Sequence, residues 1–253
     1  KLITNKTTKE NITLKVNEKS INLSIDTNKN FNYTVNCSKL GLNNITLIYN
    51  GNIYNANSSK STSFNVMKNP TSITLSNIPD TEINSQIKVK IKLVNYYKNS
   101  EIIDIIINNH TTSVKTDNNG EYTYTYNCTT YGLNNISVRY EGTSKNLNSS
   151  NQTIFTVNRL KTNIFVDNIN NPTVNNPVTI TGTLKNNYNE IITNTYLFIE
   201  YNNDTYIVNV DEQARFKFDL NNLKVGNNAF KLFYEGDNIN DNTTINKTFN
   251  VYK

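Results

Sequence analysis

Few side chains in this chain are suited to catalysis or to metal binding. Its 253 residues include one histidine, His110, and two cysteines, Cys37 and Cys128. A zinc site takes about four nitrogen or sulfur ligands at short spacing, so these residues do not predict one. The sequence also has no nucleophile elbow, no phosphate-cradling glycine loop and no carboxylate pair in a pocket-forming context. We therefore predict a protein that is not an enzyme, with no catalytic, metal-binding or cofactor-binding residues.

Two acidic loops have a superficial likeness to calcium sites. They lie at residues 117–120 and 237–241, but neither has the D-x-[DN]-x-[DN]-G pattern with a distal glutamate. Asp, Asn and Gly are also the residues that tight turns favour, and Asp117–Gly120 is the best candidate for a hairpin turn. His110 has no second histidine or cysteine nearby, so we expect a solvated loop residue.

Asparagine followed by any residue and then Ser or Thr is the acceptor pattern for N-glycosylation. The chain contains 53 asparagines, and chance alone accounts for most matches to the pattern. Several of the sites fall on the outward phase of predicted strands, where a glycan has room, although polar residues point outward in any case. The candidate sites are Asn5, Asn11, Asn22, Asn32, Asn36, Asn44, Asn57, Asn109, Asn127, Asn135, Asn148, Asn151, Asn203, Asn242 and Asn246.

Composition excludes two further classes. The net charge is +5, and the basic residues are scattered among acidic ones rather than gathered in a patch. Nucleic-acid binding usually requires a concentrated basic surface, so it is not expected. No apolar run approaches the roughly 20 residues of a membrane-spanning helix, so this segment is not expected to insert into a membrane. The abundance of Asn, Lys, Ile and Tyr also fits A/T-rich codon usage.

The sequence contains an internal repeat, which predicts how its strands are organised. The segment CSKLGLNNITLIYNG begins at Cys37, returns as CTTYGLNNISVRYEG from Cys128, and returns again as NLKVGNNAFKLFYEG from Asn222. Each copy is followed by a strand with the pattern F-x-V. We therefore predict three domains, residues 1–67, 68–158 and 159–253, and call these segments the first, second and third repeats. The short links between them predict a stiff or gently hinged rod.

Within each repeat, apolar residues alternate with polar ones, which is typical of strands with one buried face. In the second repeat we expect strands near residues 72–78, 86–94, 102–108, 112–116, 121–127, 135–141 and 153–158. Seven short strands in one unit indicate an antiparallel two-sheet sandwich. The alternation also places Tyr122, Tyr124 and Tyr126 in the core with their counterparts Phe31, Tyr33, Val35, Phe216, Phe218 and Leu220. Tyr96 and Tyr97, adjacent in a polar bend, are the pair we expect at a surface contact.

The first repeat has no counterpart of residues 70–91, because Lys1 and Leu2 align with Lys92 and Leu93. We therefore expect it to lack its opening strands and to present an open groove with unpaired strand edges. Either the missing strands precede Lys1 in a longer chain, or a neighbouring subunit donates a strand.

Cys37 and Cys128 occupy the same position in different repeats. A disulfide needs Cα atoms within about 7 Å, so we do not expect them to bond within one chain. Both are predicted to face the core as small apolar residues, with intermolecular bridging as the alternative.

The motif G-x-N-x-I-x-V-x-Y-E-G at residues 132–142, Tyr234-Glu235-Gly236-Asp237 in the third repeat, and the closing F-x-V strand together resemble the bacterial immunoglobulin-like (Big, group 3-like) repeat domains. The Asn-rich and Lys-rich composition is similar to that of adhesin-like surface proteins of methanogenic archaea. The sequence departs from the motif at Asn52 and Thr143, which replace the Asp. The resemblance assigns no catalytic residues.

The resemblance implies an all-β chain of immunoglobulin-like sandwiches that serves as an extracellular, non-catalytic stalk of a cell-surface adhesin-like glycoprotein. The alternative is a subunit of a filament, sheath or S-layer, assembled by strand complementation of the first repeat. The partners it implies are neighbouring repeats or subunits, together with cell-surface glycans or other cells. Some surface repeats of this kind carry a Lys-to-Asn cross-link beside a buried carboxylate, for which Lys88 or Lys90 are candidates.

Overall fold

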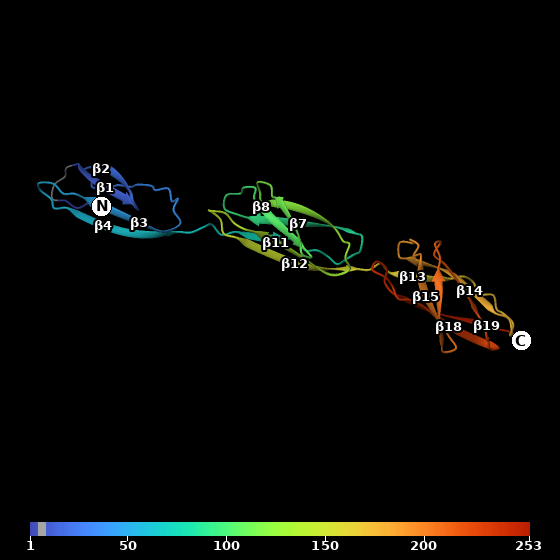
Figure 1. Cartoon of the computed structure of the whole chain (residues 1–253). Coiled ribbons are helices and arrows are strands. Elements are labelled where there is room, and N and C mark those ends of the chain that lie inside the picture. Colours follow the sequence, from blue (N-terminus) through green and yellow to red (C-terminus); the bar gives the residue numbers. More distant parts are fainter. Residues whose placement is uncertain (5–8) are drawn as a thin grey trace. The chain divides into compact units, whose positions relative to one another are not determined.

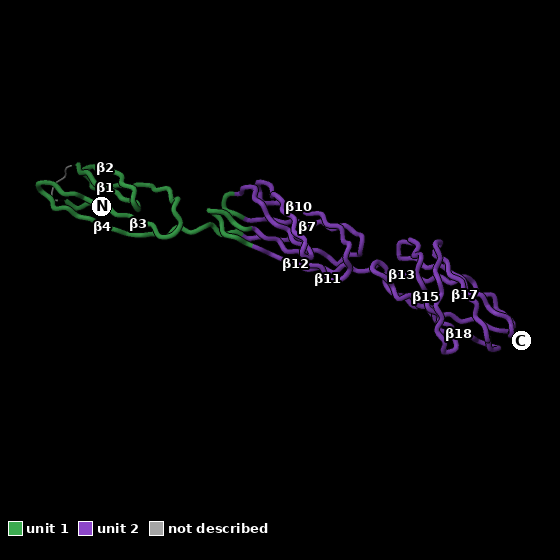
Figure 2. Tube along the Cα trace, viewed as in Figure 1, with its two compact units in different colours: residues 1–71, 95–97, 141–149 green, residues 72–94, 98–140, 150–253 purple. Residues whose placement is uncertain are grey.

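The computed structural model describes residues 1–4 and 9–253, and this part of the chain is entirely β-structure and loops (Figure 1). None of these residues forms a helix long and apolar enough to cross a membrane. The chain divides into two compact units, shown in green and purple in Figure 2, and each is described by itself. The first contains residues 1–71, 95–97 and 141–149, and the second contains residues 72–94, 98–140 and 150–253.

The first repeat contains one antiparallel sheet of four strands, in the order β2 (Lys19–Ile25), β1 (Glu10–Val16), β3 (Gly41–Tyr49) and β4 (Ser58–Val66). Among its described residues, Leu2, Ile12, Ile25 and Tyr49 form a small buried cluster. Three partly buried side chains, Leu23, Phe31 and Leu47, pack against them. This sheet therefore buries little apolar surface.

The second repeat contains two sheets. One has three strands, in the order β10 (Glu121–Asn127), β7 (Gln86–Val94) and β5 (Ser72–Leu75). The other has five, in the order β6 (Thr81–Glu82), β12 (Ser149–Asn158), β11 (Gly132–Tyr140), β8 (Ile102–Ile107) and β9 (His110–Lys115). Buried side chains of both sheets form one hydrophobic cluster, as expected for a sandwich. Each of the seven predicted strands has a counterpart here, whereas the two-residue strand β6 was missed.

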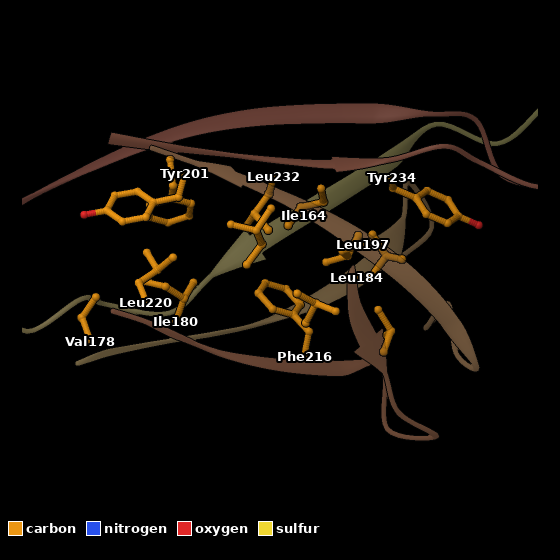
Figure 3. Packing of buried hydrophobic residues seen from close by; sticks show 14 of the residues in the cluster. Ile164, Val178, Ile180, Leu184, Leu197, Tyr201, Phe216, Leu220, Leu232 and Tyr234 are labelled. Atoms are coloured by element: carbon orange, nitrogen blue, oxygen red, sulfur yellow. The ribbon is translucent and has the colours of Figure 1, made fainter. Parts of the chain in front are cut away.

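The third repeat contains seven strands, in the order β13 (Thr162–Val166), β14 (Val178–Asn186), β17 (Arg215–Leu220), β16 (Asp204–Val210), β15 (Thr195–Tyr201), β18 (Gly226–Tyr234) and β19 (Thr243–Val251). A single residue pair, Val210 with Phe216, joins β16 to β17. The chain therefore folds into two layers linked at one corner. Figure 3 shows Ile180, Phe216 and Leu220 on the opposite side of this interior from Tyr201 and Leu232.

The most regular feature of the repeats is a buried asparagine two residues after a glycine. Asn43, Asn134 and Asn228 are 3%, 1% and 5% exposed. The Asn134 side-chain amide donates to the backbone oxygens of Thr130 and Gly132, and Asn43 and Asn228 make the corresponding pairs of bonds. A buried amide needs such partners, and here they fix the loop ahead of β3, β11 and β18. The G-x-N motif is thus structural.

The Tyr-x-Gly motif has a structural explanation as well. Tyr49, Tyr140 and Tyr234 are buried at the ends of β3, β11 and β18. The following loop turns at Gly142 with a φ of +80°, where a Cβ would lie 2.7 Å from the Asn146 oxygen. Glycine avoids both the positive-φ strain and this clash.

Two predictions about strands were wrong. Residues 31–36, the counterpart of most of β10, form no strand. In the second repeat β10 pairs with β7, and the residues of the first repeat that align with β7 are Lys1, Leu2 and Ile3. The turn at Asp117–Gly120 does form, but it does not close a hairpin. The strands on either side of it, β9 and β10, belong to different sheets.

Backbone bonds also fix the links between the repeats. Asn69 donates to the Lys145 oxygen and accepts from the Leu147 amide, at 2.8 and 2.9 Å. Leu160, 91 positions later, makes the same pair of bonds to Ile239 and Asp241, at 2.8 and 2.7 Å. The residues that link two repeats are thus held by hydrogen bonds to the repeat that follows.

Candidate functional site

All described candidate glycosylation sites lie at the surface. Asn5 falls outside the described residues, and the side chains of the remaining asparagines are exposed. Among the described sites, three use their side chains in hydrogen bonds: the Asn151 amide donates to the Ile73 oxygen, while the Asn22 and Asn127 side-chain oxygens accept bonds from Thr13 and Gln86. A glycan attaches to the amide nitrogen, and in Asn151 that nitrogen is already hydrogen-bonded. Asn151 is therefore the least accessible of the three. Occupancy of the sites stays a prediction.

The two cysteines differ in their surroundings. Both are free thiols, as expected from their positions in separate repeats. Cys128 is fully buried, and this burial raises the pKa of its thiol. Its backbone pairs with Asn84 and Ser85, which precede β7. Cys37 is exposed, which corrects the prediction that it faces the core, because the first repeat has no counterpart of Asn84 and Ser85 to cover it.

The two acidic loops behave as turns. Asp117 Oδ1 accepts hydrogen bonds from the backbone amides of Asn119 and Glu121. Asp237 Oδ1 accepts from the amides of Ile239 and Asn240, and its Oδ2 accepts from the Tyr234 hydroxyl. In both loops the aspartate Oδ1 therefore accepts backbone amides and stabilises the turn.

The same contacts alter the pKa values of Asp237 and Tyr234. Partial burial would raise the pKa of Asp237, but bonds from the Asn240 side chain and from the Asn240 and Ile239 amides outweigh it and lower the pKa. Burial, followed by the bond to Asp237, raises the pKa of Tyr234. The pair is thus held as a carboxylate and a neutral phenol.

The remaining chemical candidates are exposed. His110 begins β9 rather than lying in a loop. Lys88 and Lys90 lie on the solvent side of β7, so they lack the burial that a cross-link would require. Tyr96 and Tyr97 are 75% and 49% exposed and meet edge to face with ring centroids 5.1 Å apart. They stay the aromatic pair that we expect at a surface contact.

The sequence reasoning missed a buried ion pair in the first repeat. Lys29 and Glu10 are both buried, with Lys29 Nζ 3.7 Å from Glu10 Oε1. The Tyr49 hydroxyl and the Asn52 side-chain amide also donate to the Glu10 carboxylate, at 3.0 and 3.1 Å. The aligned positions of Lys29 in the other repeats are Gly120 and Ala214, and that difference was the available signal. Buried pairs of this kind cost desolvation and add little net stability.

The third repeat has a polar recess on its outer surface. A cavity of about 660 Å³ lies between the β15–β16 turn and strands β18 and β19. Lys231 and Glu200 form an ion pair at 3.2 Å beside it. Next to them, the rings of Phe198 and Phe233 are stacked with centroids 4.8 Å apart. Its lining offers carboxylate, ammonium, amide and hydroxyl groups.

The first repeat has a different recess, on its inner side. A cavity of about 350 Å³ lies between the end of β1 and residues 33–39, and Val16, Val35 and Phe64 contribute apolar walls to it. In the second repeat, the residues aligned with Val16 and Phe64 are Ile107 and Phe155, which are 4% and 2% exposed. The recess therefore lies where the second repeat has packed core.

The comparisons with known proteins yield structural likeness alone. No family model and no curated protein matches the chain. Among solved structures, it is similar to part of a 1.5-MDa bacterial ice-binding adhesin, at 12% identity over 98% of this chain and 88% of that one, with a TM-score of 0.36. It is also similar to a calcium-stabilized adhesin of an Antarctic bacterium, at 12% identity over 98% of this chain and 66% of that one, with a TM-score of 0.32. A third likeness is to fibronectin(III)-like modules of Clostridium thermocellum CbhA, at 13% identity over 71% of this chain and 94% of that one, with a TM-score of 0.31. TM-scores this low carry no functional argument.

Proposed function

We propose that this chain is a non-catalytic spacer segment of an extracellular, adhesin-like surface protein, built from three tandem domains. The observation that supports it is the repeated link. Asn69 and Leu160, each at the start of a repeat, make the same pair of backbone hydrogen bonds to a later loop of that repeat. Leu160 also buries its side chain in the cluster of the second repeat. A chain that repeats both its fold and its connection suits a role in setting distance.

The surface chemistry supports an extracellular role. The described glycosylation candidates are exposed asparagines spread over all three repeats. Glycans at such sites are bulky and solubilising and require a secretory route. The two thiols are unpaired, so this proposal does not rest on disulfide chemistry.

The test is surface labelling of the source cells. An antibody raised against residues 1–253 is expected to stain intact cells, and brief protease treatment of intact cells should remove that staining. Staining that appears only after permeabilisation would contradict the proposal. Peptides from this segment of the native protein whose candidate asparagines carry added sugar mass would show that glycans are attached.

An assembly role is the second candidate, and one observation favours it. The inner face of the first repeat is incompletely covered, with Ile45, Leu47 and Phe64 all half-buried. A subunit of a filament or surface layer would use this face to join copies. Sedimentation of the purified chain tests it, because growth of large species with concentration would support assembly and a monomer at all concentrations would exclude it.

A further inference from the structure

The first repeat buries a lysine ammonium beside a carboxylate. Lys29 Nζ lies 3.7 Å from Glu10 Oε1, and both residues are buried. The Tyr49 hydroxyl donates to the other oxygen, Glu10 Oε2, at 3.0 Å and holds the carboxylate in place. Lys29 has a φ of +60°, a conformation that favours glycine, and the aligned residue of the second repeat is Gly120. A long basic side chain is thus kept where a strained backbone and a desolvated charge both oppose it.

A carboxamide meets the same carboxylate oxygen. Asn52 Nδ2 donates to Glu10 Oε1 at 3.1 Å, so the amide and the ammonium both approach one atom. The side-chain oxygen of Asn52 accepts hydrogen bonds from the backbone amides of Tyr54 and Asn55, at 2.8 and 2.9 Å. Two such donors polarise the carbonyl group and stabilise the negative charge that develops on its oxygen when a nucleophile attacks the carbon.

The amine, the carboxylate and the carboxamide occur together in one repeat. The positions aligned with Lys29 and Asn52 are Gly120 and Thr143 in the second repeat, and Ala214 and Asp237 in the third. The buried tyrosine, in contrast, is present in all three repeats. The tyrosine therefore belongs to the shared fold, whereas the three reactive groups are an addition to the first repeat. A buried ion pair adds little net stability, so stability does not account for that addition.

We propose that the first repeat forms an intramolecular isopeptide bond between Lys29 Nζ and Asn52 Cγ, with Glu10 as the general base and acid. Glu10 accepts a proton from the Lys29 ammonium, and the neutral Nζ attacks Asn52 Cγ. Glu10 then delivers that proton to Nδ2, the Cγ–Nδ2 bond breaks, and Nζ loses its second proton to the departing ammonia. One amide bond and one ammonium ion form, and Glu10 is again a carboxylate.

The surroundings of the three groups favour this step. Burial disfavours separated charges, so passing a proton from the ammonium to the carboxylate costs less here than in water. The fold also holds the nucleophile, the base and the polarised carbonyl group together, which replaces a bimolecular encounter. The reaction needs no oxidant and no cofactor. The bond forms once in each chain, so the protein turns over no substrate.

Peptide mapping of the full chain is the experiment. The purified protein is unfolded and digested with trypsin, which cleaves after lysine but not after a lysine whose Nζ is in an amide bond. We expect residues 20–39, uncleaved at Lys29, to be joined to residues 40–60, with a mass lower than their sum by one ammonia. Tandem mass spectrometry should place the bond between Lys29 and Asn52. Recovery of residues 20–29 and 40–60 only as separate peptides would overturn the proposal.

The joined peptide, and not the mass of the intact chain, is the deciding readout. Ring closure at an Asn-Gly pair also releases ammonia, and the chain contains such a pair at Asn50–Gly51. That side reaction joins no peptides. A bond from Lys29 to Asn55 or to Glu10 would overturn the choice of Asn52 as the acceptor.

Three variants test the roles of the residues. Lys29→Arg keeps the charge but removes the nucleophile, so no joined peptide is expected. Glu10→Gln should slow joining after refolding by more than about 100-fold, because it removes the general base. Lys15→Arg is the matched control, since Lys15 is exposed on the same strand as Glu10, and it should join as the unaltered chain does. Hydrogen exchange of β3 amides shows that each variant is folded. A folded Glu10→Gln chain that joins at the unaltered rate would overturn the role of Glu10.

Discussion

The first and third repeats have the same loop motifs but differ in their cores. Asn43 and Asn228 make the same loop-closing hydrogen bonds, and Tyr49 and Tyr234 are buried at the same point. Among the described residues, the buried cluster of the first repeat nevertheless contains only Leu2, Ile12, Ile25 and Tyr49, whereas that of the third fills a two-layer sandwich. The difference shows that the loop geometry is encoded locally, whereas the core depends on strands that face one another across the interior.

The largest expected effect comes from removing the same core side chain in each repeat. Leu232→Ala in the third repeat should cost about 2–5 kcal/mol, because Leu232 is fully buried. Leu47→Ala at the aligned position should cost about 1 kcal/mol, since Leu47 is half-buried and solvent can fill the space. Native-state hydrogen exchange of β18 and β3 amides measures each repeat separately. Equal losses would contradict the difference in cores.

Deleting the buried asparagine should affect the repeats alike. Asn134→Ala and Asn43→Ala should each cost about 1–3 kcal/mol, because each removes a buried amide that donates to two backbone oxygens. Leu133→Ala is the matched control: Leu133 is 71% exposed, and the loss should stay within about 0.5 kcal/mol. Urea unfolding followed by residue-specific exchange distinguishes these outcomes. A much smaller loss for Asn43 would show that its loop is not independently formed.

Glycine substitutions in the second repeat should separate strain from clash. Gly142→Ala places a Cβ 2.7 Å from the Asn146 oxygen at a φ of +80°, and we expect a loss of about 2 kcal/mol. Gly132→Ala also has a positive φ, but no atom lies within 4 Å of its Cβ, so about 1 kcal/mol should be lost. In the first repeat, the new Cβ of Gly51→Ala would lie 2.7 Å from the Asn55 oxygen, so we expect the same loss of stability as for Gly142→Ala. Thermal unfolding of the three variants gives the ranking.

The smallest expected effect is a pH dependence confined to the third repeat. Its folded state lowers the pKa of Asp237, so the stability from this carboxylate is present above the unfolded pKa near 3.9 and is lost as pH falls through the folded value. The aligned positions are Asn52 and Thr143, so the other repeats should not show this contribution. Exchange of β18 amides between pH 5 and pH 2.5 is the measurement. Asp237→Asn should remove the dependence, and an unchanged profile in that variant would assign it to another group.

Sequence alone predicted the all-β fold and the strands of the second repeat, because period-two alternation and the repeated motif are local signals. It did not predict the fate of residues 31–36. Their alternation matches that of β10, but strand formation there requires a partner that lies elsewhere in sequence. The error on Cys37 has the same cause. The role of Asn134 was hidden because one asparagine among 53 carries no signal by itself, although its position in all three motifs was visible.

The parallel pairing of β6 with β12 has a consequence for how the second repeat would respond to pulling. Val157 and Asn158 lie opposite Thr81 and Glu82, so the closing strand runs alongside the opening segment in the same direction. Tension applied to the two ends would load these bonds together in shear instead of opening them one by one. The third repeat has the same arrangement between Thr173 and Tyr252. Under load, the second and third repeats would therefore both be held by bonds of this kind.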